Sequence, residues 1–190
     1  FDNHRTDHGD VPLILWNHRW EYDKNPTDFF KVLEKVREYG YNFKLAVMGE
    51  NFNQHPDVFI EAHKLFEDQI VQWGYTESFT DYAQWLWKAD ILPVTSNQEF
   101  FGVSVMEAIY CGVWPILPAR LSYKELFPNA NYKNNFYSDD SIFYEKIELS
   151  ILNINDIRKT SLKNIPKKYD WENISKEFDD LLDDLAKSTD

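Results

Sequence analysis

Short apolar runs alternate with longer amphipathic segments along most of this chain. Each run holds apolar side chains at consecutive positions, which is typical of strands that are buried on both faces. The runs are bounded by glycine, proline or charged residues, as strands in a compact domain are. Five strands are predicted in this way, at residues 12–16, 43–48, 70–73, 91–94 and 114–117.

The segments between these runs have the spacing of helices. Thr27 opens a helical pattern that stops at Gly40, Pro56 stands in the first turn of a second helix, and Thr80 opens a third. A fourth helix is predicted at about residues 103–112. Strands that alternate with helices form right-handed crossovers, so an α/β fold with a doubly wound parallel sheet is predicted. Such sheets bind ligands beyond the carboxyl ends of their strands.

The chain reads as a single domain followed by a helical tail. Its 190 residues are 43% apolar, which is enough for one core, and no linker rich in Pro, Gly or Ser divides them. We expect a core at about residues 12–153 and a tail at about residues 154–187. From Asp170 onward eight acidic residues accompany two lysines, opposite an apolar stripe. This acidity predicts a solvated helix face.

Composition narrows the class of protein. The formal net charge of −12 argues against a general nucleic-acid clamp, because neutralising phosphates requires clustered Lys and Arg. No apolar run approaches the roughly 18 residues that span a bilayer, so no transmembrane segment is expected. The single cysteine, Cys111, cannot form an internal disulfide and suits a reducing compartment. We therefore expect a cytoplasmic protein.

Residues 17–26 form the loop between the first predicted strand and its helix. Arg19 can offer a planar fork to a diphosphate and Lys24 a point charge, while the following helix adds partial positive charge. The alternative is that both cations are surface residues that pair with Glu21 and Asp23. Its place after a strand makes this loop a candidate anion site.

Residues 95–102 form a second candidate loop, after the fourth predicted strand. Glu99 in the loop and Glu107 in the helix could reach two parts of one ligand, and Gly102 would let backbone N–H groups come close to it. As an alternative, Ser104 and Glu107 have the spacing of a capping box, in which Glu107 would serve its own helix. Capping explains Glu99 less well.

Other sites are less favoured by the sequence. It contains no Walker A loop, no G-x-G-x-x-G and no Cys/His cluster with metal spacing, which disfavours a dinucleotide or structural zinc site. His18 stands beside Arg19 and could help to bind phosphate. Phe100 and Phe101 favour core packing over a stacking platform.

Several motifs in order resemble the carboxy-terminal domain of retaining GT-B glycosyltransferases, the glycosyl transferases group 1. The resemblance covers about residues 12–185 and implies a Rossmann-like domain that forms the C-terminal half of a GT-B fold. The motifs are Arg19-x4-Lys24, Gly49-Glu50, Gly74-Tyr75, Ala89-Asp90, Glu99-x7-Glu107, Cys111-Gly112 and Tyr169-Asp170-Trp171.

The resemblance implies a role for each matching residue. Arg19 and Lys24 would bind the diphosphate of a nucleotide sugar and stabilise the departing nucleoside diphosphate. Glu99 would contact the donor sugar without acting as a covalent nucleophile, and Glu107 would bind the ribose. No metal or other cofactor is implied, because cations and helix dipoles supply the electrostatics. Further donor-binding positions are His18, Gly49, Glu50, Gly74, Tyr75 and the backbone of Phe101, Gly102 and Val103.

A narrower similarity concerns the segment from Leu15 to Lys24 and the run Glu99-Phe-Phe-Gly-Val. Both are similar to a subfamily that transfers mannose from GDP-mannose to queuosine in a tRNA anticodon. His18, where a small residue is common, and the spacing of residues 112–115 depart from the wider family. GT-B enzymes need a second, acceptor-binding domain, which would also contact any tRNA. Since that half is absent here, we expect the chain alone to be inactive.

Three other interpretations stay open. The chain could belong to a transferase of polysaccharide or glycolipid synthesis that uses another nucleotide sugar. It could also be a non-catalytic nucleotide-binding module, in which Glu99 and Glu107 are structural. A nucleotide-sugar epimerase of related fold is a further possibility.

Overall fold

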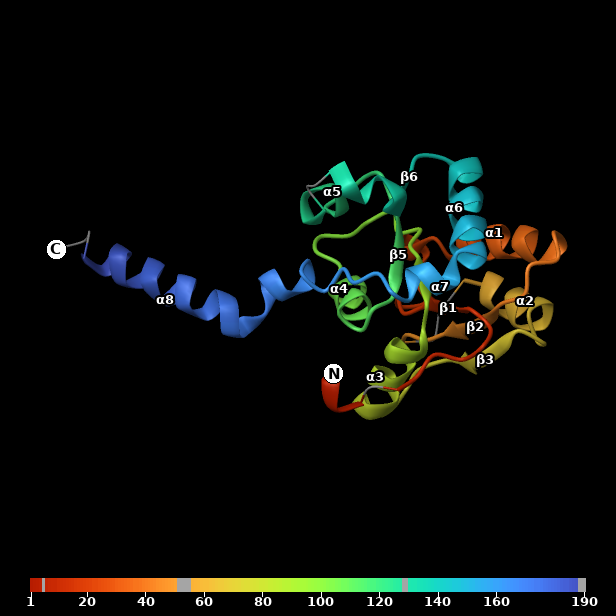
Figure 1. Cartoon of the computed structure of the whole chain (residues 1–190), viewed down its shortest axis with the longest axis horizontal. Coiled ribbons are helices and arrows are strands. Elements are labelled where there is room, and N and C mark those ends of the chain that lie inside the picture. The colour runs from red at the N-terminus through yellow and green to blue at the C-terminus, as the bar shows by residue number, and fades with distance from the viewer. Residues whose placement is uncertain (5, 51–55, 128–129, 188–190) are drawn as a thin grey trace.

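A six-stranded parallel sheet forms the centre of the computed structural model, which describes residues 1–4, 6–50, 56–127 and 130–187 (Figure 1). The strand order is β3-β2-β1-β4-β5-β6. This confirms the doubly wound α/β fold that the alternation of strands and helices predicts. The strands are β1 (Leu13–Trp16), β2 (Lys44–Val47), β3 (Ile70–Trp73), β4 (Ile91–Pro93), β5 (Trp114–Pro118) and β6 (Phe136–Tyr137).

Helices cover both faces of the sheet. One core contains residues of α1, α2 and α6, and the other contains residues of α3, α4 and α5. The α-helices of the described residues are α1 (Pro26–Glu38), α2 (Val58–Leu65), α3 (Phe79–Lys88), α4 (Val103–Tyr110), α5 (Tyr123–Leu126), α6 (Asp140–Leu152), α7 (Ile154–Ile157) and α8 (Trp171–Lys187). Short 3-10 helices are η1 (Asp2–His4), η2 (Tyr22–Lys24), η3 (Ala130–Asn135) and η4 (Pro166–Tyr169).

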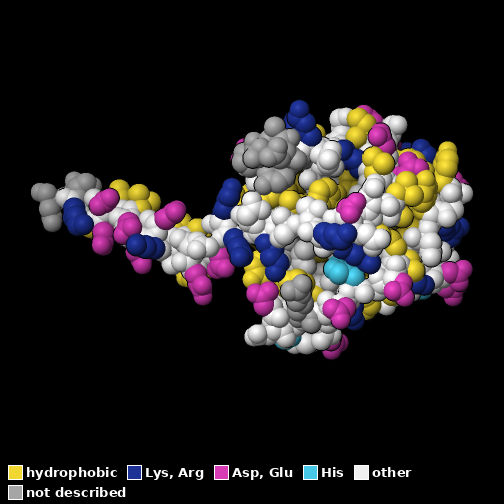
Figure 2. All heavy atoms as spheres, in the orientation of Figure 1, with side chains coloured by type: hydrophobic (Ala, Val, Ile, Leu, Met, Phe, Trp, Pro, Cys, Tyr) yellow, Lys and Arg dark blue, Asp and Glu magenta, His cyan; other side chains and the backbone are white. Residues whose placement is uncertain are grey.

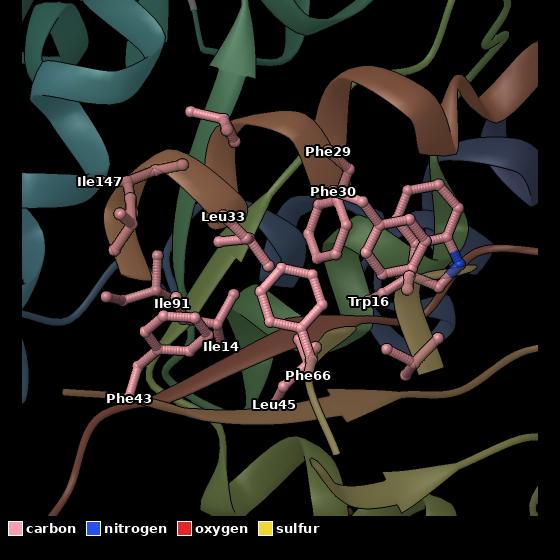
Figure 3. Close-up of a cluster of buried hydrophobic side chains, with 14 of the residues drawn as sticks. Ile14, Trp16, Phe29, Phe30, Leu33, Phe43, Leu45, Phe66, Ile91 and Ile147 are labelled. Atoms are coloured by element: carbon pink, nitrogen blue, oxygen red, sulfur yellow. The ribbon is translucent and has the colours of Figure 1, made fainter. Parts of the chain in front are cut away.

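Strand β1 explains why the apolar runs are continuous. Ile14 and Trp16 point into the core beneath α1, whereas Leu13 and Leu15 point into the opposite core. Successive side chains of a strand face opposite sides, so a strand between two helical layers needs apolar residues at every position. Figure 3 shows the first core, where Trp16 meets the ring of Phe29 at a centroid distance of 4.9 Å.

The start of one helix differs from the sequence prediction, and the start of another, at the predicted position, rules out a proposed cap. Helix α1 begins at Pro26, not Thr27, because Asn25 takes the left-handed conformation just before it (φ 54°). Helix α4 begins at Val103, after Gly102 with φ 82°. Ser104 therefore lies inside the helix and cannot cap it. The capping box proposed for Ser104 and Glu107 is wrong.

The C-terminal segment has two parts. Helix α7 packs beside α6, and Ile165 is buried in the second core, so the chain stays on the body of the domain up to η4. Helix α8 then extends away from the body (Figure 1). Its acidic side chains face solvent as predicted, but so do apolar ones such as Trp171 and Phe178 (Figure 2). None of the helices in the described residues is long and apolar enough to cross a membrane.

A buried ion pair fastens α7 to the amino ends of β1 and β4. The Asp90 carboxylate is fully buried and accepts hydrogen bonds from Nε and Nη2 of Arg158, at 2.7 and 2.9 Å. It also accepts from the Leu13 N–H at 2.9 Å, and His8 Nδ1 lies 3.0 Å away. Burial alone would raise the pKa of Asp90, but these partners hold that pKa below its ordinary value.

We expect Arg158→Ala to lower the free energy of unfolding by about 3 kcal/mol, because it leaves a buried carboxylate without its cation. Urea unfolding measures this loss. Lys159→Ala is the matched control, since its exposed ammonium pairs with the exposed Asp156, and we expect a change within about 0.5 kcal/mol. Because the pKa of Asp90 is lowered in the folded state, its contribution is present at neutral pH and disappears as the pH falls through that lowered pKa. Equal losses in the two variants would contradict this account.

Candidate functional site

The loops after β1 and β4 form a crevice at the middle of the sheet. β1 and β4 are neighbours, but the chain leaves β1 toward α1 on one face and leaves β4 toward α4 on the other. In open α/β sheets, ligands bind at the point where the chain leaves two neighbouring strands toward opposite faces. Several hydrogen bonds join the loops; for example, Thr95 Oγ1 donates to the Lys24 carbonyl at 2.9 Å, and Asn97 N donates to the Asp23 carbonyl at 2.7 Å.

Lys24 and Glu99 meet across this crevice. Lys24 is only 8% exposed, and its Nζ lies 3.4 Å from Glu99 Oε2 and 3.1 Å from Asp23 Oδ2. Nζ also donates to the Gln98 carbonyl at 3.1 Å. Lys24 therefore pairs with Asp23, as the alternative interpretation predicts, and it also contacts Gln98 and Glu99 of the second loop. A cation fixed by several oxygens needs little reorganisation to stabilise a further negative charge.

The second oxygen of Glu99 faces the start of α4. Oε1 accepts from the N–H groups of Phe100 and Gly102, at 3.1 and 3.0 Å. A Cβ at Gly102 would lie 3.4 Å from the Tyr123 ring and 3.5 Å from Glu99 Cγ, at ordinary van der Waals distance, so it is the left-handed backbone that favours glycine here. Glu99 thus holds the backbone that leads into α4. The partial positive charge of this helix start adjoins the Lys24 ammonium.

His18 and Asn17 form the floor of the crevice. His18 Nδ1 lies 3.2 Å from Ser104 Oγ, and Asn17 Nδ2 donates to the Ser104 carbonyl at 2.8 Å. Burial, helped by the nearby Lys24 charge, lowers the pKa of His18 to about 4. The imidazole is therefore neutral at physiological pH, and it could give a ligand a hydrogen bond but not a positive charge.

Arg19 lies at the edge of the crevice. Its side chain is 53% exposed and its Nη2 lies 3.1 Å from Glu21 Oε2, which is the pairing that the sequence offered as an alternative. An exposed pair of this kind is weak and can exchange for a ligand phosphate. The pocket has a volume of about 410 Å³ and is lined by Asn17, His18, Arg19, Lys24, Glu99, Phe100, Phe101, Gly102, Val103 and Ser104.

Gly49 and Glu50 contact the loop after β1, which forms one wall of this pocket, whereas Gly74 and Tyr75 lie apart from the pocket. A Cβ on Gly49 would lie 1.9 Å from the His18 carbonyl oxygen, and Trp20 N donates to the Glu50 carbonyl at 3.0 Å. Gly74, at the end of β3, instead lines a separate hollow beside Trp73. Tyr75 is exposed. The four positions expected near a nucleotide base therefore fall into two groups.

Glu107 lies on α4 beside a residue of α3. Oε2 of Glu107 accepts a hydrogen bond from the Tyr82 hydroxyl at 2.7 Å. Burial raises the pKa of Glu107, and the Tyr82 bond offsets part of that increase. Glu107 lines a hollow of about 350 Å³ that shares Phe101 and Val103 with the crevice pocket. A single elongated ligand could thus contact both carboxylates.

Sequence reasoning missed two residues of this region and misjudged a third. Nη2 of Arg120 lies 3.2 Å from the carbonyls of Thr95 and Ser96 and braces the second loop. Its place just after β5 was a usable signal, because β5 adjoins β4. Tyr82 fits the apolar pattern of α3, which gives no sign of its hydrogen bond to Glu107. Core packing is wrong for Phe100, which is 96% exposed.

Comparison with known proteins shows the family of the chain. A model described as glycosyl transferases group 1 matches residues 2–151. The tRNA-queuosine alpha-mannosyltransferase of Drosophila melanogaster is 31% identical over 167 residues, which cover 83% of this chain. The chain spans 44% of the length of that protein.

Solved structures share the fold at lower identity. A sucrose-phosphate synthase from Thermosynechococcus elongatus superposes with a TM-score of 0.74 at 16% identity, over 94% of this chain and 46% of that one. The pneumococcal O-GlcNAc transferase GtfA, solved with UDP and GlcNAc, gives a TM-score of 0.73 at 16% identity, over 94% of this chain and 36% of that one.

Proposed function

The chain belongs to the glycosyl transferases group 1 family, and from this premise we propose that it binds GDP-mannose for a retaining transferase that mannosylates queuosine in tRNA. The observation that carries the proposal is the contact between Lys24 and Glu99. It joins a cation and a carboxylate in the crevice between the loops after β1 and β4. The mannose and the queuosine rest on the similarity to the Drosophila enzyme. The guanine nucleotide rests on the resemblance in the two loops.

The donor would lie along the start of α4. Its diphosphate would sit between Lys24 and the backbone N–H groups of Phe101 and Val103, because the Gly102 N–H is held by Glu99. Arg19 would exchange Glu21 for a phosphate oxygen. The mannose would contact Glu99 and the neutral His18. The ribose would lie against Glu107, across the shared wall of Phe101 and Val103. This arrangement places the diphosphate against the two cations and one sugar against each carboxylate.

The chemistry follows from these charges. When the bond between the anomeric carbon and the phosphate oxygen breaks, its electron pair goes to the oxygen of the departing diphosphate. Lys24 and Arg19 would stabilise that negative charge, and the Glu99 carboxylate would stabilise the positive charge that develops on the sugar ring. The acceptor hydroxyl would attack from the same face and give its proton to the departing phosphate, which retains the anomeric configuration. We expect no metal requirement.

The acceptor would be bound elsewhere. Because the chain spans less than half of its Drosophila relative, we assign the tRNA and its queuosine to a second domain of the complete transferase. The acidic surface implied by the net charge of −12 is consistent with that division. The chain alone should then bind the donor but transfer little or no sugar.

Isothermal titration of the protein with GDP, GDP-mannose and UDP-sugars tests the proposal. We expect guanosine nucleotides to bind more tightly than uridine nucleotides, and Arg19→Ala to weaken GDP binding by about tenfold. Lys44→Ala is the control, because Lys44 lies at the amino end of β2, whereas the crevice lies beyond the carboxyl ends of the strands. A preference for uridine nucleotides, together with no response to Arg19→Ala, would exclude the mannosyl assignment.

A further inference from the structure

Tyr82 donates a hydrogen bond to Glu107, and the proposed donor site so far gives this hydrogen bond no role. It lies in the first turns of α3, and its hydroxyl reaches across to α4 and donates to Glu107 Oε2 at 2.7 Å. Burial and the neighbouring Glu107 charge raise the pKa of Tyr82 well above its ordinary value. The hydroxyl therefore keeps its proton at physiological pH and acts as the donor in this pair.

The hydrogen bond constrains the carboxylate that it binds. An ionised carboxylate has two oxygens with about four acceptor positions, and Tyr82 takes one position on Oε2. Within the described residues, Oε1 of Glu107 has no hydrogen-bond partner. The side chain lines the hollow next to the start of α4. A fixed carboxylate with free acceptor positions suits two adjacent hydroxyl donors, which is the arrangement of the 2′ and 3′ hydroxyls of ribose.

We propose that Tyr82 is a positioning residue for the donor, holding Glu107 in the orientation that accepts hydrogen bonds from the two ribose hydroxyls. Tyr82 would thereby set the preference for ribonucleotides over 2′-deoxyribonucleotides. This inference rests on the proposed function, in which Glu107 contacts the ribose. The competing explanation is that the bond between Tyr82 and Glu107 merely joins α3 to α4.

Ligand pairs that differ only at the 2′ position separate these explanations. Dissociation constants for GDP and 2′-deoxy-GDP, and for UDP and 2′-deoxy-UDP, would be measured by isothermal titration of the purified protein. The variants are Tyr82→Phe, which removes only the hydroxyl, and Glu107→Gln. Tyr41→Phe is the matched control, because the Tyr41 hydroxyl also donates to a carboxylate, that of Glu148 on α6. Thermal melting of each variant verifies that it is folded.

We expect the wild-type protein to prefer the ribonucleotide by about tenfold or more, as for a hydrogen bond to a charged group. Tyr82→Phe should reduce that preference to about threefold or less. The loss should come from weaker ribonucleotide binding, with the 2′-deoxynucleotide affinity unchanged. Glu107→Gln should also reduce the preference, and Tyr41→Phe should leave it intact.

Three results would overturn the inference, and they separate it from the proposed function. If Glu107→Gln removes the ribose preference but Tyr82→Phe keeps it, Glu107 binds ribose without help from Tyr82. If Tyr82→Phe weakens both members of a pair equally, the hydrogen bond is a structural link between helices. If the wild-type protein shows no ribose preference, the assignment of Glu107 in the proposed function fails, and the role of Tyr82 fails with it.

Discussion

Replacing Lys24 with methionine should lower the rate of sugar transfer by the complete transferase by about 100- to 1,000-fold, the usual effect of losing a preorganised electrostatic contact. Two losses combine in this variant. The diphosphate loses its buried cation, and Glu99 loses the ammonium that lies 3.4 Å from Oε2. Asp23 and Glu99 would then face an anionic donor without a counter-charge, so binding should weaken as well.

Lys31→Met is the matched control for this prediction. Lys31 lies on α1, is largely exposed, pairs with the exposed Asp140 at 3.3 Å and does not line the crevice pocket. Its removal should leave transfer unchanged. Single-turnover rates with saturating donor measure the effect in both variants. A Lys24→Met enzyme that keeps its rate within about threefold would show that the ammonium does not act on the departing diphosphate.

Replacing Gly49 with alanine should lower the free energy of unfolding by about 3 kcal/mol or more, because two costs coincide at this position. The backbone has φ 112°, which side chains rarely adopt, and the new Cβ would lie 1.9 Å from the His18 carbonyl oxygen. That oxygen also accepts from Trp16 Nε1 at 2.8 Å, so the turn cannot move freely. Displacing the turn should weaken donor binding too.

Gly74→Ala separates the clash from the backbone strain. Gly74 ends the neighbouring strand β3 with φ 97°, but a Cβ there would meet no atom within 4 Å. Its cost should be the left-handed strain alone, about 1–2 kcal/mol. Urea unfolding of the two variants gives the comparison. Similar losses for both would mean that the contact with His18 contributes nothing.

The sequence predicts the sheet well because strands that are buried on both faces appear as continuous apolar runs. Leu13 through Trp16 serve both cores, so β1 appears as a run of apolar residues that has no helical or alternating pattern. β6 was not located, since its two residues, Phe136 and Tyr137, are too few to show a period. The start of α1 depends on a single backbone conformation, that of Asn25, which pattern alone does not fix.

The candidate site was predictable where strand ends carry charged residues. Lys24 and Glu99 stand 75 positions apart, yet both follow strands whose carboxyl ends meet, and the structure brings them to 3.4 Å. Tyr82 was not predictable in this way. Tyrosine fits the apolar face of α3 as well as it fits a hydrogen bond, and only the packing of α3 beside α4 shows which carboxylate it meets.

The hydrogen bonds of Glu99 and Glu107 are a second case in which spacing along the sequence does not fix the partner. Spacing favours Glu107 as a capping residue, because Ser104 precedes it by three positions. The structure instead gives the backbone N–H groups before α4 to Glu99 and leaves Glu107 with Tyr82. Gly102, in the left-handed conformation, precedes the helix, so α4 begins at Val103, one residue before Ser104. Ser104 therefore cannot cap the helix.

A crystal structure of the protein with GDP-mannose tests the central claim most directly, which is that the crevice between the loops after β1 and β4 holds the donor. We predict the diphosphate between Lys24 and the start of α4, the mannose against Glu99, and the ribose against Glu107. A nucleotide bound instead in the hollow beside Trp73, with Lys24 and Glu99 still paired and untouched by it, would contradict the account.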